Sequence, residues 1–399
     1  MRTSARKILR GNVLWLSVVS FLNDAASEMI YPLLPFFVMT TLGAGPAFLG
    51  MLEGVAESTA SLVKLASGWI SDRVTRRKPL IFWGYAVATV ARPLIAIATS
   101  PWHVLGIRFA DRLGKGARSA PRDALLAASV EPGLRGRAFG LHMAADHAGA
   151  VLGPLMASAL LYFMPGRFRF VFALALIPGL ISLIVIAARV REEDRVPVVT
   201  AAPVIHGSIF ESFRDPVLLR YLIVLMIFTL GNATDAFLLL RARDLGVALA
   251  ALPLLWCVHN LSKMVWNVIG GSISDRFGLR RSIIGGWLFY AATYAGFAFA
   301  SNAWHIWGLF LFYGLFYGLT EGPEKALISS LAPPERRGAA FGAFHFSIGI
   351  AALPASIIFG IVWARMGAEA AFLMGASLAL IAALALPFVL QENTRNLAA

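Results

Sequence analysis

Four carboxylates lie inside apolar runs near the start of the chain. Asp24 and Glu28 are four residues apart in the stretch FLNDAASEMIYPLLP, and Glu53 and Glu57 have the same spacing further on. Residues four apart share one face of a helix, so we expect each pair to project together. A carboxylate in such surroundings must be neutralised by a proton, a cationic ligand or a basic side chain. These four residues are our candidates for proton carriers, with Asp24 and Glu28 first.

Other ionisable residues in apolar stretches extend the set of candidate substrate and proton ligands: Arg108, Asp146, His147, Asp235, Lys263, Glu321, Glu324 and Lys325. Any one of them can instead form a static ion pair between helices. Cys257 and His259 have side chains that bind soft or borderline metals, which makes them weak metal candidates. Their spacing matches no metal motif, and a lone buried histidine is more often hydrogen-bonded than a metal ligand.

The composition indicates a protein that lives in lipid. Mean hydropathy is +0.72, 58% of the residues are hydrophobic and 14% are charged, against roughly 25% charged in soluble domains. The 399 residues leave room for about twelve helical spans. Open sheet is excluded because backbone groups in hydrocarbon must be satisfied internally, and no segment alternates as a barrel strand would. The predicted fold class is therefore all-α, a polytopic membrane protein.

We expect the spans at 13–39, 47–70, 79–99, 101–130, 136–164, 168–189, 217–240, 247–272, 281–300, 302–331, 336–363 and 370–390. Arginine and lysine concentrate in alternate loops, which predicts that both termini are cytoplasmic in a multi-pass protein of the cell inner (plasma) membrane. The net charge of +13 does not indicate nucleic acid, because the basic residues are spread over short loops between apolar segments.

Two segments of the first half return in the second half. SGWISDRVTRRK at 67–78 returns as GGSISDRFGLRR at 270–281, and PRDALLAASVEPGLRGRAFG at 121–140 returns as PEKALISSLAPPERRGAAFG at 323–342. In both pairs the two copies are separated by nearly the same number of residues. Because each half has an even number of spans, the two halves share one orientation in the membrane. We therefore predict a six-helix bundle at 1–189, a cytoplasmic linker at 190–216 and a second six-helix bundle at 217–399.

The first repeated segment resembles motif A of the major facilitator superfamily, G-x-x-x-D-R-x-x-R-R-K. The matching residues are Gly68, Asp72, Arg73, Arg76, Arg77 and Lys78. The resemblance implies a twelve-helix transporter in which Asp72 pairs with arginines of neighbouring helices and forms a gate on the cytoplasmic side. A buried charge pair that can break and re-form suits such a gate. The second copy retains Asp275 and Arg276.

Two further segments narrow the resemblance. Arg108 stands where motif B of proton-coupled antiporters of this superfamily has its arginine, although Asp111-Arg112 replaces the usual glutamine and glycine. Gly140, Gly149, Gly153 and Pro154 have the spacing of motif C, which is found mainly in exporters. Small residues permit close helix packing and proline bends a helix, so we expect the motif C segment to pack against the other half of the protein.

These features predict a secondary transporter that exports a small molecule, cations included, in exchange for protons. No phosphate-binding loop, nucleophile elbow or zinc-hydrolase motif occurs in the sequence, so we expect no enzyme, no ATP-driven pump and no cofactor. The expected partners are a small-molecule or ion substrate, protons and the lipid bilayer, for a monomer that binds no nucleic acid. A transporter of transition-metal ions or their chelates is one alternative. A scaffold or receptor that does not transport is another.

Overall fold

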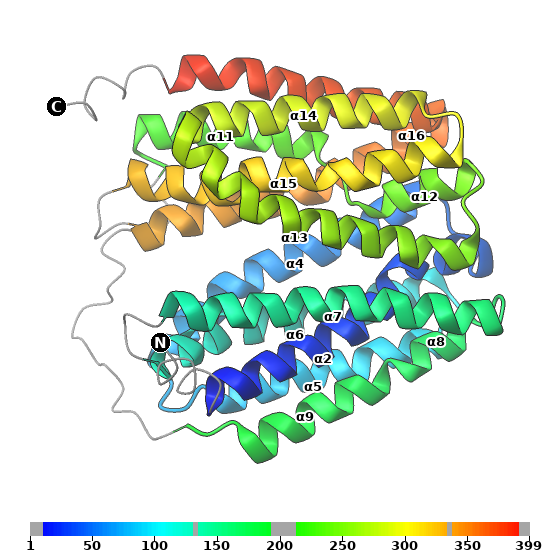
Figure 1. Ribbon diagram of the computed structural model, residues 1–399, viewed down its shortest axis with the longest axis vertical. Coiled ribbons are helices and arrows are strands. Elements are labelled where there is room, and N and C mark those ends of the chain that lie inside the picture. Colours follow the sequence, from blue (N-terminus) through cyan, green and yellow to red (C-terminus); the bar gives the residue numbers. More distant parts are fainter. Residues whose placement is uncertain (1–10, 131–134, 193–212, 333–336, 391–399) are drawn as a thin grey trace. The chain divides into compact units, whose positions relative to one another are not determined.

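The computed structural model describes residues 11–130, 135–192, 213–332 and 337–390, and within these ranges it contains helices and no strand. The first half forms α2 (Asn12–Ile30), α4 (Pro46–Arg73), α5 (Lys78–Leu94), α6 (Pro101–Ala128), α7 (Arg135–Phe163), α8 (Phe168–Leu174) and α9 (Leu176–Arg189). The second half forms α11 (Pro216–Gly231), α12 (Ala236–Asp244), α13 (Leu252–Phe277), α14 (Leu279–Phe299), α15 (Ala303–Leu331) and α16 (Arg337–Val389) (Figure 1).

Every span expected from the sequence corresponds to a helix or to a set of consecutive helices. α2 continues through short turns, η1 (Tyr31–Leu33), α3 (Leu34–Phe36) and the π-helical η2 (Phe37–Thr41). α16 covers the last two expected spans, and Gly367, at φ 89°, separates its two helical parts. Glycine adopts this left-handed backbone without the steric cost that a side chain would add.

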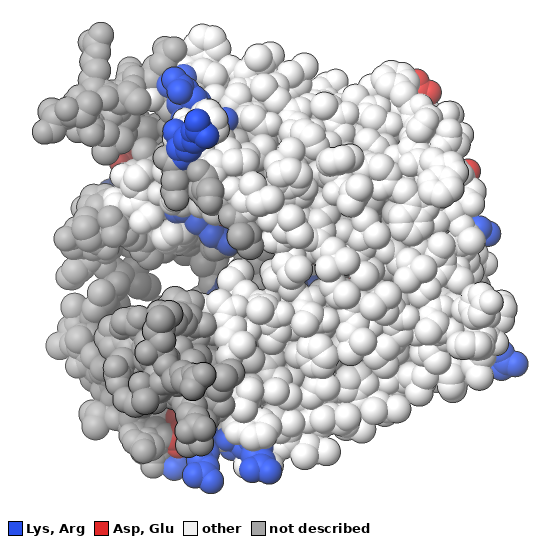
Figure 2. Space-filling view, viewed as in Figure 1, with Lys and Arg blue, Asp and Glu red and all other residues white. Residues whose placement is uncertain are grey.

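Seven stretches of the described residues are long and apolar enough to cross a membrane, as judged by length and composition. α4, α6 and α15 are not among these stretches, and they carry many of the ionisable residues singled out above. Figure 2 shows the same separation on the face that it views: charged side chains gather toward the helix ends, and the stretch between is nearly free of them. An apolar exterior of this kind is what the lipid-facing side of a membrane helix requires.

The described contacts divide the chain into two compact units. The first contains Met1–Ala44, Thr59–Val199 and Ala248–Cys257, and the second contains Gly45–Ser58, Thr200–Val247 and Val258–Ala399. α4 and α13 therefore each contribute to both units. The predicted linker 190–216 lies largely outside the described residues.

Glycines set the closest helix contacts inside the first unit. A Cβ at Gly149 or Gly153 of α7 would collide with the backbone of α2, at Phe21 and Ala25 respectively. This is the close approach that small residues permit between membrane helices. It brings the polar face of α2, which carries Asp24 and Glu28, against α7.

The second unit contains a break in the seventh expected span. α11 ends at Gly231, and α12 begins at Ala236 after a non-helical segment. The Tyr290 hydroxyl donates to the carbonyl of Gly231 (3.1 Å) and lies 3.2 Å from the Asn232 side-chain oxygen. An interrupted helix is tolerated at membrane depth only where neighbouring groups satisfy the freed backbone. The sequence predicts a single span at 217–240, and the structure interrupts it after Gly231.

Candidate transport sites

Asp24 and Glu28 of α2 are both half-buried and both accept hydrogen bonds from neutral donors. The Asn23 side-chain amide donates to Asp24 Oδ1 at 2.9 Å. The Trp256 indole, from the part of α13 that belongs to the first unit, donates to Glu28 Oε2 at 2.6 Å. Among the described residues, no lysine or arginine forms an ion pair with either carboxylate.

A second group of polar residues connects α2, α6 and α7. Arg122 donates to Asp123 Oδ1 through two nitrogens, at 3.0 and 2.9 Å, and to the Ser20 hydroxyl at 3.3 Å. The Ser20 hydroxyl in turn donates to the Asp146 carboxylate. Asp146, expected as a transport residue, therefore belongs to a hydrogen-bonded chain that ends on an arginine. His147, the next residue, is half-buried.

The most enclosed charge cluster is centred on Asp111 of α6. Arg92 of α5 donates to Asp111 Oδ1 at 2.9 Å, and both side chains are more than 90% buried. Arg108 and Arg112 lie 3.8 Å from Asp111 Oδ2. Arg92 also donates to the backbone and side-chain oxygens of Asn23, at 3.1 and 2.9 Å. The sequence matches Arg108 to the arginine of motif B, and the structure makes it one of three arginines around a single carboxylate.

Sequence reasoning missed Arg92 and gave Asp111 no role. The signal for Arg92 was present, because it is the only lysine or arginine between Pro79 and Thr99 of an otherwise apolar predicted span. An ionisable residue in such a position marks an interior site with a partner. Asp111 is that partner.

The second unit holds Asp235 at the break between α11 and α12. The hydroxyls of Tyr313 and Tyr317 donate to its two carboxylate oxygens, at 3.2 and 2.9 Å. His259 Nε2 lies 3.8 Å from Asp235 Oδ2, and Lys263 Nζ lies 3.8 Å from the centre of the Tyr317 ring. The predicted site residue Asp235 is thus surrounded by aromatic donors with one lysine nearby.

Further tyrosines enlarge this aromatic site. The Tyr290 and Tyr294 rings stack at 4.1 Å between centroids, and Tyr290 lies 6.1 Å from Tyr313. The His259 ring stacks on Tyr313 at 5.3 Å. None of these tyrosines was singled out from the sequence, because an aromatic residue on a membrane helix faces lipid by default.

The remaining predicted carboxylates occupy different environments. Glu53 is buried and Glu57 is exposed, both on the part of α4 that belongs to the second unit. The proton-carrier role expected for Glu53 and Glu57 stays a prediction. Glu324 is buried and accepts from the Trp287 indole at 3.0 Å. Glu321 is 41% exposed and pairs with Lys325 at 3.5 Å.

The predicted gate falls partly on side chains outside the described set, those of Asp72, Arg73 and Asp275. The latch that they were predicted to form stays a prediction. Arg77 is buried and donates to the Ser71 hydroxyl at 3.0 Å. Arg276 is exposed and lies over the Phe277 ring at 5.5 Å. A Cβ at Gly68 would meet Ala120 at an ordinary 3.7 Å, so Gly68 is not required for close packing.

The motif C residues divide into two kinds. Gly149 and Gly153 are packed against α2, as described above, whereas a Cβ at Gly140 would meet no atom within 4 Å. Pro154 lies inside α7. We expected this segment to pack against the other half of the chain. Its two tight glycines pack against α2 of the same half, and the Ser158 hydroxyl one turn on donates to the Ala250 carbonyl at 2.6 Å.

The weak metal candidates do not form a site. Cys257 and His259 are two residues apart on α13, and residues at this spacing point to different sides of a helix. Among the described residues, no group of three or more His, Cys, Asp or Glu side chains is arranged to hold a metal ion. The alternative of metal transport therefore has no geometric support.

Comparisons with known proteins agree over nearly the whole chain. A family model described as Major Facilitator Superfamily matches residues 16–347 and 237–398. An uncharacterized MFS-type transporter of Methanocaldococcus jannaschii is 30% identical over 387 residues, which cover 96% of this chain and 95% of that protein. The multidrug resistance protein MdtH of Salmonella arizonae is 25% identical over 328 residues, which cover 81% of this chain and 78% of the relative.

Solved structures of similar fold include transporters of several kinds. The crystal structure of the nucleoside transporter NupG superposes with a TM-score of 0.79 at 13% identity, over 95% of this chain and 99% of that chain. The POT family transporter PepTSo superposes with a TM-score of 0.77 at 13% identity, over 96% of this chain and 98% of that chain. At these identities the likeness concerns the fold alone.

Proposed function

Because the chain belongs to the Major Facilitator Superfamily, we propose that it is a proton-coupled exporter of a small molecule, with an organic cation as the favoured substrate class. The family and the all-α polytopic fold expected from the sequence are confirmed. The chain is thus a membrane transporter and not an enzyme. Proton coupling, the direction of transport and the substrate class are the parts that we propose.

One observation supports proton coupling above the others: among the described residues, Asp24 and Glu28 accept hydrogen bonds only from neutral donors, whereas two arginines of the same unit are paired with other acids. Arg92 and Arg122 pair with Asp111 and Asp123. A carboxylate buried without a cation is costly, so it must take up a proton or bind a cationic ligand. Competition between a proton and a cation for the same carboxylate is the simplest form of exchange.

The aromatic site supports a cationic substrate. Asp235 supplies a negative charge, and the stacked rings of Tyr290, Tyr294 and Tyr313 surround it with faces that attract cations. Such an arrangement suits an organic ammonium group, which an aromatic face and a carboxylate can bind together. We propose that Lys263, over the Tyr317 ring, occupies this place when the substrate is absent.

Export is supported by the motif C spacing and by the relative whose name describes multidrug resistance. Alternating access in this fold proceeds by movement of one half against the other around a site near the bilayer midplane. We place both termini on the cytoplasmic side of the inner membrane, from the distribution of basic residues. We also propose that the monomer is the working unit.

Transport in proteoliposomes with an imposed pH gradient tests the proposal. Uptake of a panel of organic cations is followed together with proton movement, which is read from a trapped pH-sensitive dye. We expect substrate movement against proton movement in the wild type, and loss of the coupled proton signal in Asp24→Asn and Glu28→Gln. Glu369→Gln is the matched control, because Glu369 is exposed beyond the Gly367 break.

Three results decide the assignment. Unchanged coupling in both neutral variants would remove Asp24 and Glu28 as proton carriers. Transport of the cations with no dependence on the pH gradient would overturn proton coupling. Loss of activity in the Glu369→Gln control to the same degree would show that the assay responds to any lost carboxylate.

A further inference from the structure

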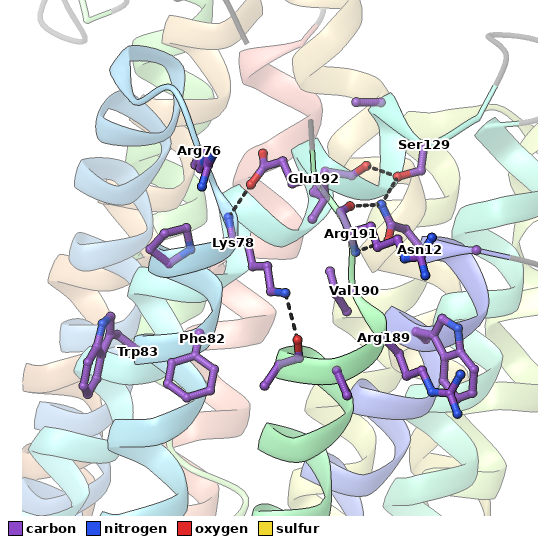
Figure 3. Close-up of a pocket in the computed structure, with 17 residues that line it drawn as sticks. Asn12, Arg76, Lys78, Phe82, Trp83, Ser129, Arg189, Val190, Arg191 and Glu192 are labelled. Atoms are coloured by element: carbon purple, nitrogen blue, oxygen red, sulfur yellow. Dashed lines mark hydrogen bonds between the residues drawn. The ribbon is translucent and has the colours of Figure 1, made fainter. Parts of the chain in front are cut away.

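A cavity of about 1450 Å³ opens at one end of the first unit. It is formed by the start of α2, the start of α5, the end of α6 and the segment after α9, and Figure 3 shows its lining. None of the transport residues discussed above faces it except Arg76 and Lys78 of the predicted gate segment. The cavity is therefore distinct from the carboxylate sites on α2 and α12.

Four cationic side chains line this cavity: Arg76, Lys78, Arg189 and Arg191. Among the described residues that line the cavity, Glu192 is the single carboxylate, so this part of the lining carries an excess of positive charge. A basic pocket between helices near the membrane surface is the kind of site that binds anionic headgroups. The charge excess predicts a ligand that bears a phosphate or similar anion.

Hydrogen bonds hold Lys78 and the backbone of Arg191 in place. Lys78 Nζ donates to the Ala187 carbonyl at 3.0 Å, and the Lys78 backbone N–H donates to Glu192 Oε2 at 2.6 Å. The Asn12 side chain bonds to the backbone of Arg191 in both directions, at 2.6 and 2.9 Å. The Arg189 guanidinium lies 5.1 Å from the centre of the Trp15 ring. The cavity wall is thus ordered before any ligand arrives, which reduces the entropic cost of binding.

One polar atom in the cavity lacks a partner. Glu192 Oε1 is buried and has no hydrogen-bond partner among the described residues. A buried acceptor left without a donor is unfavourable. A ligand that brings a hydroxyl group beside its anionic group would satisfy Glu192 Oε1 and the arginines at once.

The apolar side of the cavity points to a lipid. Phe82 and Trp83 lie on one side of it (Figure 3), and Trp83 is 67% exposed. Exposed apolar side chains continue along α5 on the same face, at spacings of three and four residues: Val87, Val90 and Leu94. Ile184, Leu180 and Ile177 do the same on α9, which packs beside α5. Acyl chains would lie against these stripes, whereas a soluble phosphate compound would make no use of them.

We propose that this cavity binds the headgroup of an anionic phospholipid that carries free hydroxyl groups, of the phosphatidylglycerol type. The phosphate lies among Arg76, Lys78 and Arg191, and a headgroup hydroxyl donates to Glu192 Oε1. The acyl chains extend along the exposed face of α5. The bound lipid thereby joins the start of α5 to the segment that follows α9.

Lipid binding to the purified full-length protein in detergent, measured by native mass spectrometry over a range of lipid concentrations, tests this site. We expect dioleoyl phosphatidylglycerol to bind in preference to dioleoyl phosphatidylcholine. Each cation near a membrane surface contributes about a fivefold gain in affinity for anionic lipid. The double variant Arg76→Gln/Arg191→Gln should therefore bind phosphatidylglycerol about 25-fold more weakly. Arg365→Gln, an exposed arginine elsewhere, should leave binding unchanged.

Two further ligands test whether binding requires the acyl chains and whether it requires the headgroup hydroxyls. Glycerophosphoglycerol, the same headgroup without chains, should bind far more weakly than the lipid, and equal binding would overturn the lipid assignment. Dioleoyl phosphatidic acid, which lacks the headgroup hydroxyls, should bind more weakly than phosphatidylglycerol, and equal binding would overturn the role of Glu192. Equal phosphatidylglycerol binding by the wild type and the double variant, both eluting as monodisperse folded protein, would overturn the site itself.

Discussion

Asp111 in the first unit and Asp235 in the second are both enclosed carboxylates, and their partners differ in kind. Asp111 lies among three guanidinium groups, with Arg92 nearest at 2.9 Å. Asp235 accepts from two tyrosine hydroxyls, at 3.2 and 2.9 Å. An arginine is a permanent cation that only donates, whereas a hydroxyl both donates and accepts. The tyrosine hydroxyls can hydrogen-bond to Asp235 in its charged form and in its protonated form. The arginines around Asp111 can only donate, so they cannot accept a hydrogen bond from a protonated Asp111.

The difference separates a structural carboxylate from one that can change its state. Protonation of Asp111 would remove the carboxylate charge that three buried guanidinium groups share, which is strongly unfavourable. Protonation of Asp235 leaves both tyrosine hydroxyls able to keep a hydrogen bond to it. We infer that the Asp111 cluster fixes α5 and α6 against each other throughout transport, while Asp235, like Asp24 and Glu28, exchanges its partner during the cycle.

We expect the largest effect from neutralising Asp111. Asp111→Asn leaves Arg92, Arg108 and Arg112 without their shared anion, and removal of one partner of a buried ion pair costs about 3–5 kcal/mol. We expect a large loss of folded protein, measured as the free energy of unfolding in mixed micelles by denaturant titration. Asp24→Asn, which breaks no ion pair among the described residues, is the matched comparison.

A double variant tests the Asp111 cluster even if Asp111→Asn alone fails to fold. Asp111→Asn/Arg92→Gln removes the nearest uncompensated charge as well and should recover part of the lost stability. If Asp111→Asn unfolds at the same denaturant concentration as Asp24→Asn, the Asp111 cluster contributes no more than an ordinary polar contact, and the distinction drawn here is wrong.

The next largest effect concerns two glycines of the same motif. Gly153→Ala places a methyl group against the α2 backbone at Ala25, whereas Gly140→Ala points into open space. Overpacking of this kind costs about 1–3 kcal/mol. We expect Gly153→Ala to lower the thermal unfolding temperature in detergent and Gly140→Ala to leave it unchanged. A stable Gly153→Ala protein with unaltered transport would mean that α2 and α7 separate at little cost.

The aromatic site permits a test with an effect of similar size. Tyr317→Phe removes the 2.9 Å donor to Asp235 and keeps the ring, and a lost hydrogen bond to a charged group is worth about 1.5–3 kcal/mol. We expect a measurable fall in the free energy of unfolding and weaker substrate binding in a direct binding assay. Tyr162→Phe is the control, because Tyr162 is 75% exposed. Equal behaviour of the two variants would remove Tyr317 from the site.

The helices and the family followed from the sequence because lipid imposes strong constraints. A long apolar run must be a helix, so spans such as 79–99 were placed to within a few residues. The carboxylates Asp24 and Asp235 were recognised because a charge in an apolar run is rare. Their partners were not predictable: Arg92 donates across from another helix, and a tyrosine such as Tyr313 carries no charge to reveal it. Helical spacing alone also could not show that Glu53 is buried while Glu57 is exposed.

The smallest effect contrasts one ion pair from each copy of the second repeated segment. PRDALL in α6 returns as PEKALI in α15, so Arg122-Asp123 of the first copy corresponds to Glu324-Lys325 of the second, with the charges reversed. Arg122 is 17% exposed in its 2.9 Å pair with Asp123, whereas Lys325 is 48% exposed and pairs with Glu321 at 3.5 Å. Solvent-exposed pairs contribute about 0–1 kcal/mol. We therefore expect Lys325→Gln to leave the free energy of unfolding nearly unchanged and Arg122→Gln to lower it measurably. An equal loss in both variants would show that the two copies use their charges alike, despite the reversal.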